Sequence, residues 1–156
     1  MPLLPSINPR IVDSLYCEAL VLADEVRSGF ERARARAQQG RDEDLDRVAL
    51  SCEALRTTTR VMHCMAWLLN HRAHFAGELS ELQLRRHGRL IANFPVSEAG
   101  TLSLLSADLV ALVRESERLY ERILRLEDAW RGAQPPAGAP GALERLRERL
   151  SAQART

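Results

Sequence analysis

Three long stretches of the chain repeat apolar residues at alternating three- and four-residue intervals. Residues at this spacing return to the same side of an α-helix, so each stretch is expected to bury one apolar stripe. The pattern predicts helices over about 9–38, 45–76 and 101–131. Because the chain length of 156 residues suits one ordinary domain, we expect an all-α fold, an antiparallel three-helix bundle.

Capping residues mark where these helices begin and end. Asn8 followed by Pro9 is a typical helix start, and Gly40 is a typical stop. Ser80 and Gln83 form a capping-box pattern, which predicts a short connecting helix over about 81–93. Such a helix, about 18 Å long, is too short to carry the chain back along the bundle. We therefore expect helices 45–76 and 101–131 to be antiparallel neighbours.

The second long helix has the most regular apolar stripe. Its spacing is that of a coiled-coil seam, and we expect it to face the bundle core. The middle position of this stripe is Thr59, and the middle position of the apolar stripe in helix 101–131 is Ser116. Antiparallel pairing would bring these two hydroxyl side chains to the same level, which predicts a small polar layer in mid-bundle. The predicted seam consists of Leu45, Val48, Cys52, Leu55, Thr59, Met62, Ala66, Leu69 and Ala73.

A change in composition near residue 132 divides the chain. Residues 1–132 carry the helical patterns, whereas residues 133–141 are rich in Pro, Gly and Ala and predict a linker. Beyond the linker, Leu143, Leu146 and Leu150 lie at helical spacing among charged residues. Residues 133–156 are therefore either a flexible tail or a docking segment that becomes ordered on a partner.

Composition argues against several classes of protein. The formal net charge of +1 supplies no field that would attract nucleic acid or an anionic membrane, and no apolar run is long enough to span one. Three sparse cysteines do not form a disulfide framework, and prolines interrupt the apolar N-terminal residues where a signal peptide would need a continuous run. We expect a cytoplasmic protein that binds neither nucleic acid nor membranes.

A second stripe runs beside the seam of helix 45–76. It combines arginine with tryptophan, which are enriched in the hot spots of protein interfaces. The alternative interpretation is a flank on which arginine stems and an indole ring pack against neighbouring helices. We take the stripe as a candidate partner-binding surface, together with the three tail leucines. Its residues are Arg56, Arg60, His63, Trp67, Asn70 and His74.

Histidines in the same helix raise the alternative of a metal or small-molecule site. His71 and His74 are spaced to share a metal, but the adjacent His63 and Cys64 point to different sides of a helix. Neither Cys52 nor Cys64 has a recognisable base and orienting group beside it, as nucleophilic catalysis requires. We expect no enzyme activity, no cofactor and no metal; a small-molecule or metal-binding helical protein remains the alternative.

Several runs of residues resemble the alphaproteobacterial DUF1465 family, which includes RcdA-like regulators of CtrA degradation. The resemblance covers about residues 14–131 and is most specific in helix 45–76. Its motifs are Ser14-Leu15-Tyr16, Arg56-Thr57-Thr58-Thr59-Arg60-Val61-Met62, Trp67-Leu68-Leu69, Gly77-Glu78-Leu79 and Leu119-Tyr120.

This resemblance implies a function that composition and spacing do not reveal. Proteins of this kind are non-enzymatic, homodimeric adaptors of the ClpXP protease. They act with CpdR-like response regulators at ClpX, and they deliver cell-cycle regulators as cargo or dock a second, PopA-like adaptor. A dimeric scaffold unrelated to proteolysis is the other interaction role that the sequence allows.

Overall fold

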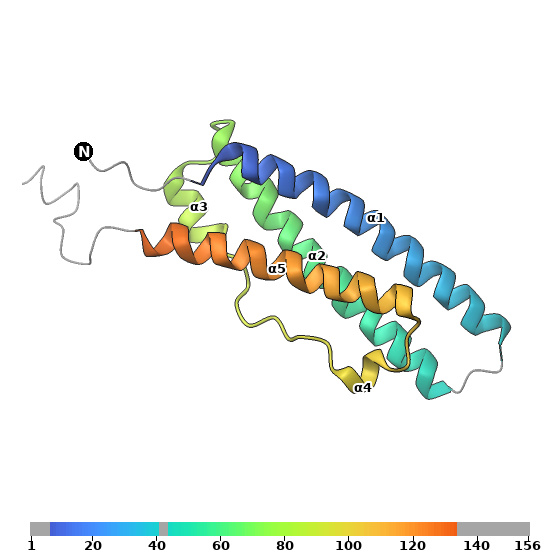
Figure 1. Cartoon of the computed structure of the whole chain (residues 1–156). Coiled ribbons are helices and arrows are strands. Elements are labelled where there is room, and N and C mark those ends of the chain that lie inside the picture. Colours follow the sequence, from blue (N-terminus) through green and yellow to red (C-terminus); the bar gives the residue numbers. More distant parts are fainter. Residues whose placement is uncertain (1–6, 41–43, 134–156) are drawn as a thin grey trace, which may run out of the picture.

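The computed structural model describes residues 7–40 and 44–133, and all of the regular structure in these ranges is helical. Three long helices pack into a bundle, which confirms the all-α fold (Figure 1). The five helices are α1 (Pro9–Gln39), α2 (Asp44–Phe75), α3 (Glu81–His87), α4 (Ala99–Leu102) and α5 (Ala107–Gly132).

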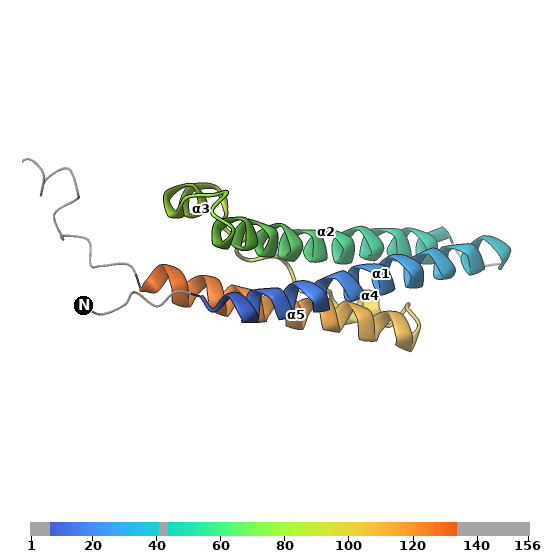
Figure 2. The ribbon, with the colours of Figure 1, turned by 90° about the horizontal axis from the view of Figure 1, so that it is seen from above.

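The bundle has two layers. Seen from above, α2 lies on one side, and α1 and α5 lie together on the other (Figure 2). This arrangement leaves α2 with one side against the other two long helices and the opposite side turned outward.

The direction of α5 differs from the prediction. Arg60 and Trp67 of α2 bond to Ser116 and Glu127 of α5, so residue numbers increase together along the two helices. Helices α2 and α5 are therefore parallel, and the predicted antiparallel pairing of helices 45–76 and 101–131 is wrong. Only α1 runs opposite to both, as its contacts from Asp13 to Arg72 and from Glu18 to Arg122 show.

An extended crossover explains the parallel arrangement. Helix α3 ends at His87 and not near residue 93, because the chain leaves the helix at Gly88. Residues 88–98 then return along the bundle to α4 (Figure 1). An extended chain covers about 3.3 Å per residue, more than twice the rise of a helix, so these few residues span a distance that the short predicted helix could not.

The third long helix also begins later than predicted. The side chain of Ser106 accepts a hydrogen bond from Leu109 N at 3.4 Å, and it caps the N-terminus of α5. The preceding turn belongs to the separate helix α4, which ends at Leu102. The predicted helix 101–131 is thus broken by a serine that serves as an N-cap. The caps predicted at Asn8 and Ser80 are confirmed, the latter with both capping-box hydrogen bonds.

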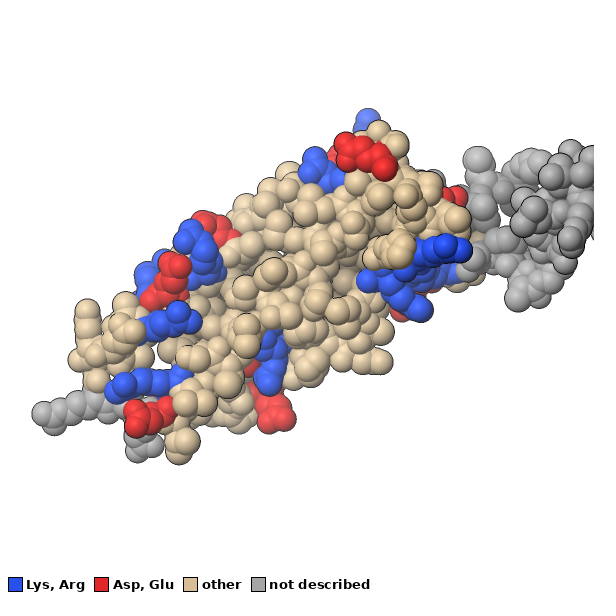
Figure 3. Space-filling model, turned by 180° about the vertical axis from the view of Figure 1, so that it is seen from behind, with Lys and Arg blue, Asp and Glu red and all other residues tan. Residues whose placement is uncertain are grey.

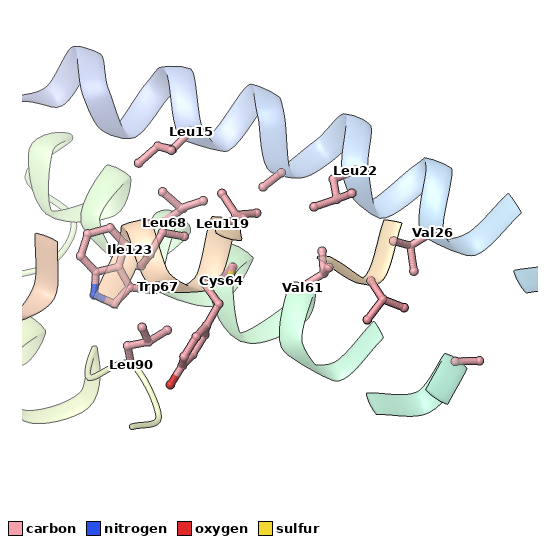
Figure 4. Close-up of a cluster of buried hydrophobic side chains, with 14 of the residues drawn as sticks. Leu15, Leu22, Val26, Val61, Cys64, Trp67, Leu68, Leu90, Leu119 and Ile123 are labelled. Carbon is pink, nitrogen blue, oxygen red and sulfur yellow. The ribbon is translucent and has the colours of Figure 1, made fainter. Parts of the chain in front are cut away.

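The apolar stripes of α1 and α5 face the core as predicted. Figure 4 shows side chains from α1, α2 and α5 pointing toward one another between the helices. The buried residues at this three- and four-residue spacing are Val12, Leu15, Ala19, Leu22, Val26 and Phe30 in α1 and Leu109, Ser116, Leu119, Ile123 and Trp130 in α5.

Helix α2 is rotated relative to the prediction. Its expected core seam lies at the surface, where Leu55 is 70% exposed and Met62 is 64% exposed. The side that packs against α1 and α5 instead carries polar residues among apolar ones. The buried residues of α2 are Glu53, Ala54, Thr57, Arg60, Val61, Cys64, Trp67, Leu68 and His71. The prediction failed because tertiary partners satisfy these polar groups, so the less apolar side of the helix is buried.

Candidate functional site

A buried polar layer joins α2, the crossover and α5. Arg60 is 1% exposed, and its Nη1 donates a hydrogen bond of 2.9 Å to Ser116 Oγ. The guanidinium also lies 3.8 Å from a carboxylate oxygen of Glu117, while the carboxylate of Glu53 accepts a hydrogen bond from Thr57 Oγ1. The predicted mid-bundle polar layer therefore exists around Ser116, but its partner on α2 is Arg60 and not Thr59, whose hydroxyl bonds to Leu55 O.

The same layer holds the crossover in place. Arg60 Nη2 donates to Pro95 O at 3.0 Å, and Glu117 accepts a hydrogen bond from Ser97 N at 2.8 Å. The Ser97 hydroxyl donates to Glu53. Burial lowers the pKa of Arg60, and the carboxylates of Glu117 and Glu53 oppose that shift. Because an arginine remains charged at neutral pH even so, the layer acts as an ionic clamp between three segments.

An aromatic cluster occupies the end of the bundle near α3. Trp67 donates its indole N–H to Glu127, and its ring stacks on His71 with centroids 3.9 Å apart. Trp130 of α5 meets His71 edge-on, and the guanidinium of Arg85 from α3 lies over Trp130 at 4.3 Å. These contacts attach α3 to the ends of α2 and α5.

His71 makes the stability of this cluster depend on pH. Burial lowers the pKa of His71 to about 4, and the nearby His74 and Arg131 contribute to the shift. In the unfolded chain this histidine takes up a proton near pH 6.5, whereas in the folded chain it does so only near pH 4. The stability of the folded state is therefore unaffected by His71 above about pH 6.5 and falls as the pH is lowered from there toward 4. Between pH 7 and pH 5 we expect the free energy of unfolding to fall by about 2 kcal/mol from this residue.

Urea unfolding at pH 7 and pH 5 measures this contribution when the chain is compared with the His71→Phe variant. The variant keeps an aromatic ring against Trp67 and has no proton to gain, so its loss of stability over this pH range should be smaller by that amount. Equal losses for the two proteins would show that His71 does not titrate in the expected range.

The structure places the residues of the predicted binding stripe in two environments. Arg60 and Trp67 belong to the interior, where they hold the polar layer and the aromatic cluster, so a partner cannot reach them in this structure. The other four members of the stripe are partly exposed: Arg56, His63, Asn70 and His74. The predicted tail residues Leu143, Leu146 and Leu150 lie outside the described residues.

The histidines of α2 have separate environments. His63 contacts Phe94 edge-on, His74 Nδ1 bonds to Leu79 O at 2.9 Å, and His71 lies between the two tryptophans.

Burial also raises the pKa of Cys64 to about 12, so this thiol stays protonated at neutral pH. Within the described ranges, no three His, Cys, Asp or Glu side chains gather where they would hold a metal ion.

The surface that the sequence prediction missed is the outward side of α2. Figure 3 shows the molecule from behind, the side on which α2 lies in Figure 2, with an uncharged band through its middle and most charged atoms toward its edges and ends. The residues of this surface are those of the predicted seam, so the sequence pattern did identify them. The prediction assigned them to the core and not to the surface. Large apolar side chains exposed along α2 are Leu45, Val48, Leu55, Met62, Leu69 and Phe75.

A groove of about 400 Å³ runs between α1 and α2 beside this outward side. Apolar side chains line it, among them Phe30 from α1 and Met65 from α2. Methionine adapts its shape readily and is common at surfaces that accept varied partners. The groove also has charged residues of α1 along it: Arg27, Glu31 and Arg34.

Comparison with known proteins places the chain in a family. The family model described as "protein of unknown function (DUF1465)" matches residues 4–154. The chain belongs to the DUF1465 family. The match confirms the resemblance to the DUF1465 family and extends its range, because it continues past residue 131 to residue 154. No curated protein and no solved structure matches this DUF1465 chain.

None of the helices in the described ranges combines the length and the apolar character that crossing a bilayer requires.

Proposed function

We propose that this DUF1465 protein is a non-enzymatic adaptor that binds other proteins. The groove between α1 and α2 carries the proposal, because it is open to solvent, mostly apolar and adjacent to an uncharged helix surface. Soluble proteins seldom expose a continuous apolar surface unless something binds there. An apolar segment of another protein, with its side chains inserted between the two helices, is the ligand that this shape fits.

The pathway of the adaptor follows from the family resemblance. We propose that the protein works with the ClpXP protease in the cytoplasm, together with CpdR-like and PopA-like partners, and that it helps deliver cell-cycle regulators for degradation. Adaptor action requires the cargo and the protease to be held at once, so it needs more than one binding surface. The groove is one of these surfaces, and the tail leucines are candidates for a second.

A matched pair of α1 variants tests the groove. Ala23 lines the groove, whereas Val21 is 61% exposed and lies outside its lining residues. Ala23→Arg adds a long charged side chain to the groove wall and should lower capture of ClpX or cargo at least tenfold, because a charge in an apolar contact is costly. Val21→Arg adds the same side chain two positions away and should leave capture unchanged.

The measurement is affinity capture from the native organism, followed by ClpXP degradation assays with the captured cargo. Circular dichroism first checks that both variants are folded. Wild-type protein should enrich ClpX and accelerate degradation of the cargo. If the wild-type protein enriches no component of the protease and accelerates no degradation, the proteolytic role is wrong. If Ala23→Arg captures as much as Val21→Arg, the groove is not the binding surface.

A further inference from the structure

The groove between α1 and α2 has a regular apolar wall. Its α1 side contributes Ala23, Val26 and Phe30, which lie three and four residues apart along one side of the helix. The groove extends along α1 from Ala23 to Arg34, about 16 Å at the rise of a helix. A ligand that fills it therefore needs two to three turns of helix with apolar side chains at a matching spacing.

A segment of the chain beyond α5 has this spacing. We call residues 143–150 the leucine segment, because its three leucines lie three and four residues apart, in the order of the three apolar residues of the α1 wall. The segment lies outside the described residues. A helix rises about 10 Å from the first of these leucines to the last, so it fits within the groove. The outward side of α2 is a poorer match, because its exposed apolar residues extend from Leu45 to Phe75, about 45 Å.

The end of α5 puts the leucine segment within reach of the groove. The helix ends at Gly132 beside the last turns of α2, since Trp130 contacts the ring of His71. Met65, the groove residue nearest to that end of α2, lies about 9 Å along the helix from His71. Passing around one helix of the bundle adds roughly 20 Å to the path. Residues 134–142 can span up to about 30 Å when extended, which covers this distance.

We propose that the leucine segment lies as a short helix in the groove of its own chain and covers it. A segment that enters at the end nearest to Gly132 runs parallel to α1, which places Leu143 level with Ala23 and Leu150 level with Phe30. A helix this short is unstable alone, so contact with the groove supplies the stability that it lacks.

Two further observations favour the leucine segment as the occupant of the groove. Leu55 and Met62 line the groove on its α2 side and are both mostly exposed, so a helix with three leucines would remove apolar surface from water. The family model continues through the segment to residue 154, so the segment belongs to the sequence unit that the family shares.

This inference rests on the proposed function of the groove and adds a means of regulating it. A segment tethered by a short linker has an effective concentration of about millimolar, so a partner in solution has to displace it. Displacement exposes the three leucines, which are the candidate second surface of the adaptor. A partner in the groove and a partner on the leucine segment should therefore strengthen each other's binding.

Hydrogen exchange of the full chain tests whether the groove is covered. Amides of the leucine segment should exchange at least tenfold more slowly in the wild-type protein than in Ala23→Arg, which places a charged side chain in the groove. Val21→Arg should keep the slow exchange. Exchange as fast in the wild-type protein as in Ala23→Arg would overturn the proposal. So would slow exchange that appears only at high protein concentration, because it would report the segment of another copy.

Binding of a labelled peptide of residues 141–152 is a second measurement, and it needs no change in α1. The full-length variant Leu146→Ser/Leu150→Ser should bind the peptide at least tenfold more tightly than the wild-type protein, whose own segment competes for the groove. The matched control Arg145→Gln/Arg149→Gln keeps the leucines and should bind the peptide as weakly as the wild-type protein. Equal affinity of the wild-type protein and the serine variant would contradict the proposal.

The outcomes separate this proposal from the adaptor role. If the wild-type protein captures ClpX through the groove while the leucine segment exchanges freely, only the covering of the groove is wrong. If the segment exchanges slowly and neither the wild-type protein nor Leu146→Ser/Leu150→Ser captures a protease component, only the adaptor role is wrong.

Discussion

Arg60→Ala should lower the free energy of unfolding by about 3–5 kcal/mol, one of the two largest effects that we expect from a single substitution. The buried guanidinium lies 3.8 Å from a carboxylate oxygen of Glu117, is also stabilised by the charge of Glu53, and bonds to the backbone of the crossover at Pro95. Without it, the two carboxylates keep Arg56 and Arg114 as their remaining cationic partners. Urea unfolding monitored by circular dichroism at pH 7 measures the loss.

Arg56→Ala is the matched control for this prediction. Arg56 contacts the same Glu53 at 3.3 Å, but its side chain is 36% exposed, so its removal should cost about 1 kcal/mol or less. A triple variant, Arg60→Met/Glu53→Gln/Glu117→Gln, removes the carboxylate charges together with the guanidinium. It should recover a measurable part of the stability lost in Arg60→Ala. An Arg60→Ala variant as stable as Arg56→Ala would show that the clamp is not important for stability.

Trp67→Ala should destabilise the protein by about 3–5 kcal/mol, because it removes a large side chain that is only 2% exposed. The substitution leaves a cavity beside His71 and Trp130 and removes the hydrogen bond to Glu127. Trp67→Phe keeps an aromatic ring in the cluster and loses the hydrogen bond, so we expect a smaller cost of about 1–2 kcal/mol.

Asn70→Ala tests whether this effect is specific to the buried side of α2. Asn70 belongs to the same predicted binding stripe but is partly exposed, and its substitution should change stability by no more than about 0.5 kcal/mol. Thermal and urea unfolding of the three variants gives the comparison. If Trp67→Ala unfolds at the same denaturant concentration as Asn70→Ala, the aromatic cluster contributes little to the fold.

These two predictions change how binding experiments on the predicted stripe should be interpreted. Substitutions at Arg60 and Trp67 act first on folding, so a loss of partner capture in such variants would report a damaged bundle. The surfaces suited to binding experiments are the groove between α1 and α2 and the outward side of α2. Variants there alter exposed or groove-lining side chains and leave the ionic clamp intact.

Local signals in the sequence predicted much of the fold. The caps at Asn8 and Ser80 and the apolar stripes of α1 and α5 are where the sequence indicates, because a helix end and a one-sided apolar stripe depend on residues close together in the chain. The DUF1465 family was also recognisable from the sequence, and the family match confirms it.

The candidate site was less predictable, because α2 has two possible sides to bury. One is an apolar heptad seam, and the other combines Trp67 and Leu68 with Glu53, Arg60 and His71. Periodicity alone favours burial of the seam, because the seam is the more apolar side. The sequence does not show that Arg60 donates hydrogen bonds to Ser116 and Pro95, which allow the other side to be buried. Similarly, nothing local to residues 88–98 indicates that they cross the bundle and reverse the expected direction of α5.

The sequence by itself therefore determined that the chain is helical, where most helices begin, and which sides of α1 and α5 are buried. The tertiary structure decided which side of α2 faces inward and which way α5 runs. The physical reason is that a buried polar group is tolerated only when distant residues pair with it. Arg60 pairs with Glu117 of α5, and Glu53 accepts a hydrogen bond from Ser97 of the crossover. These contacts turn the polar side of α2 inward, so its apolar heptad seam is left on the outside.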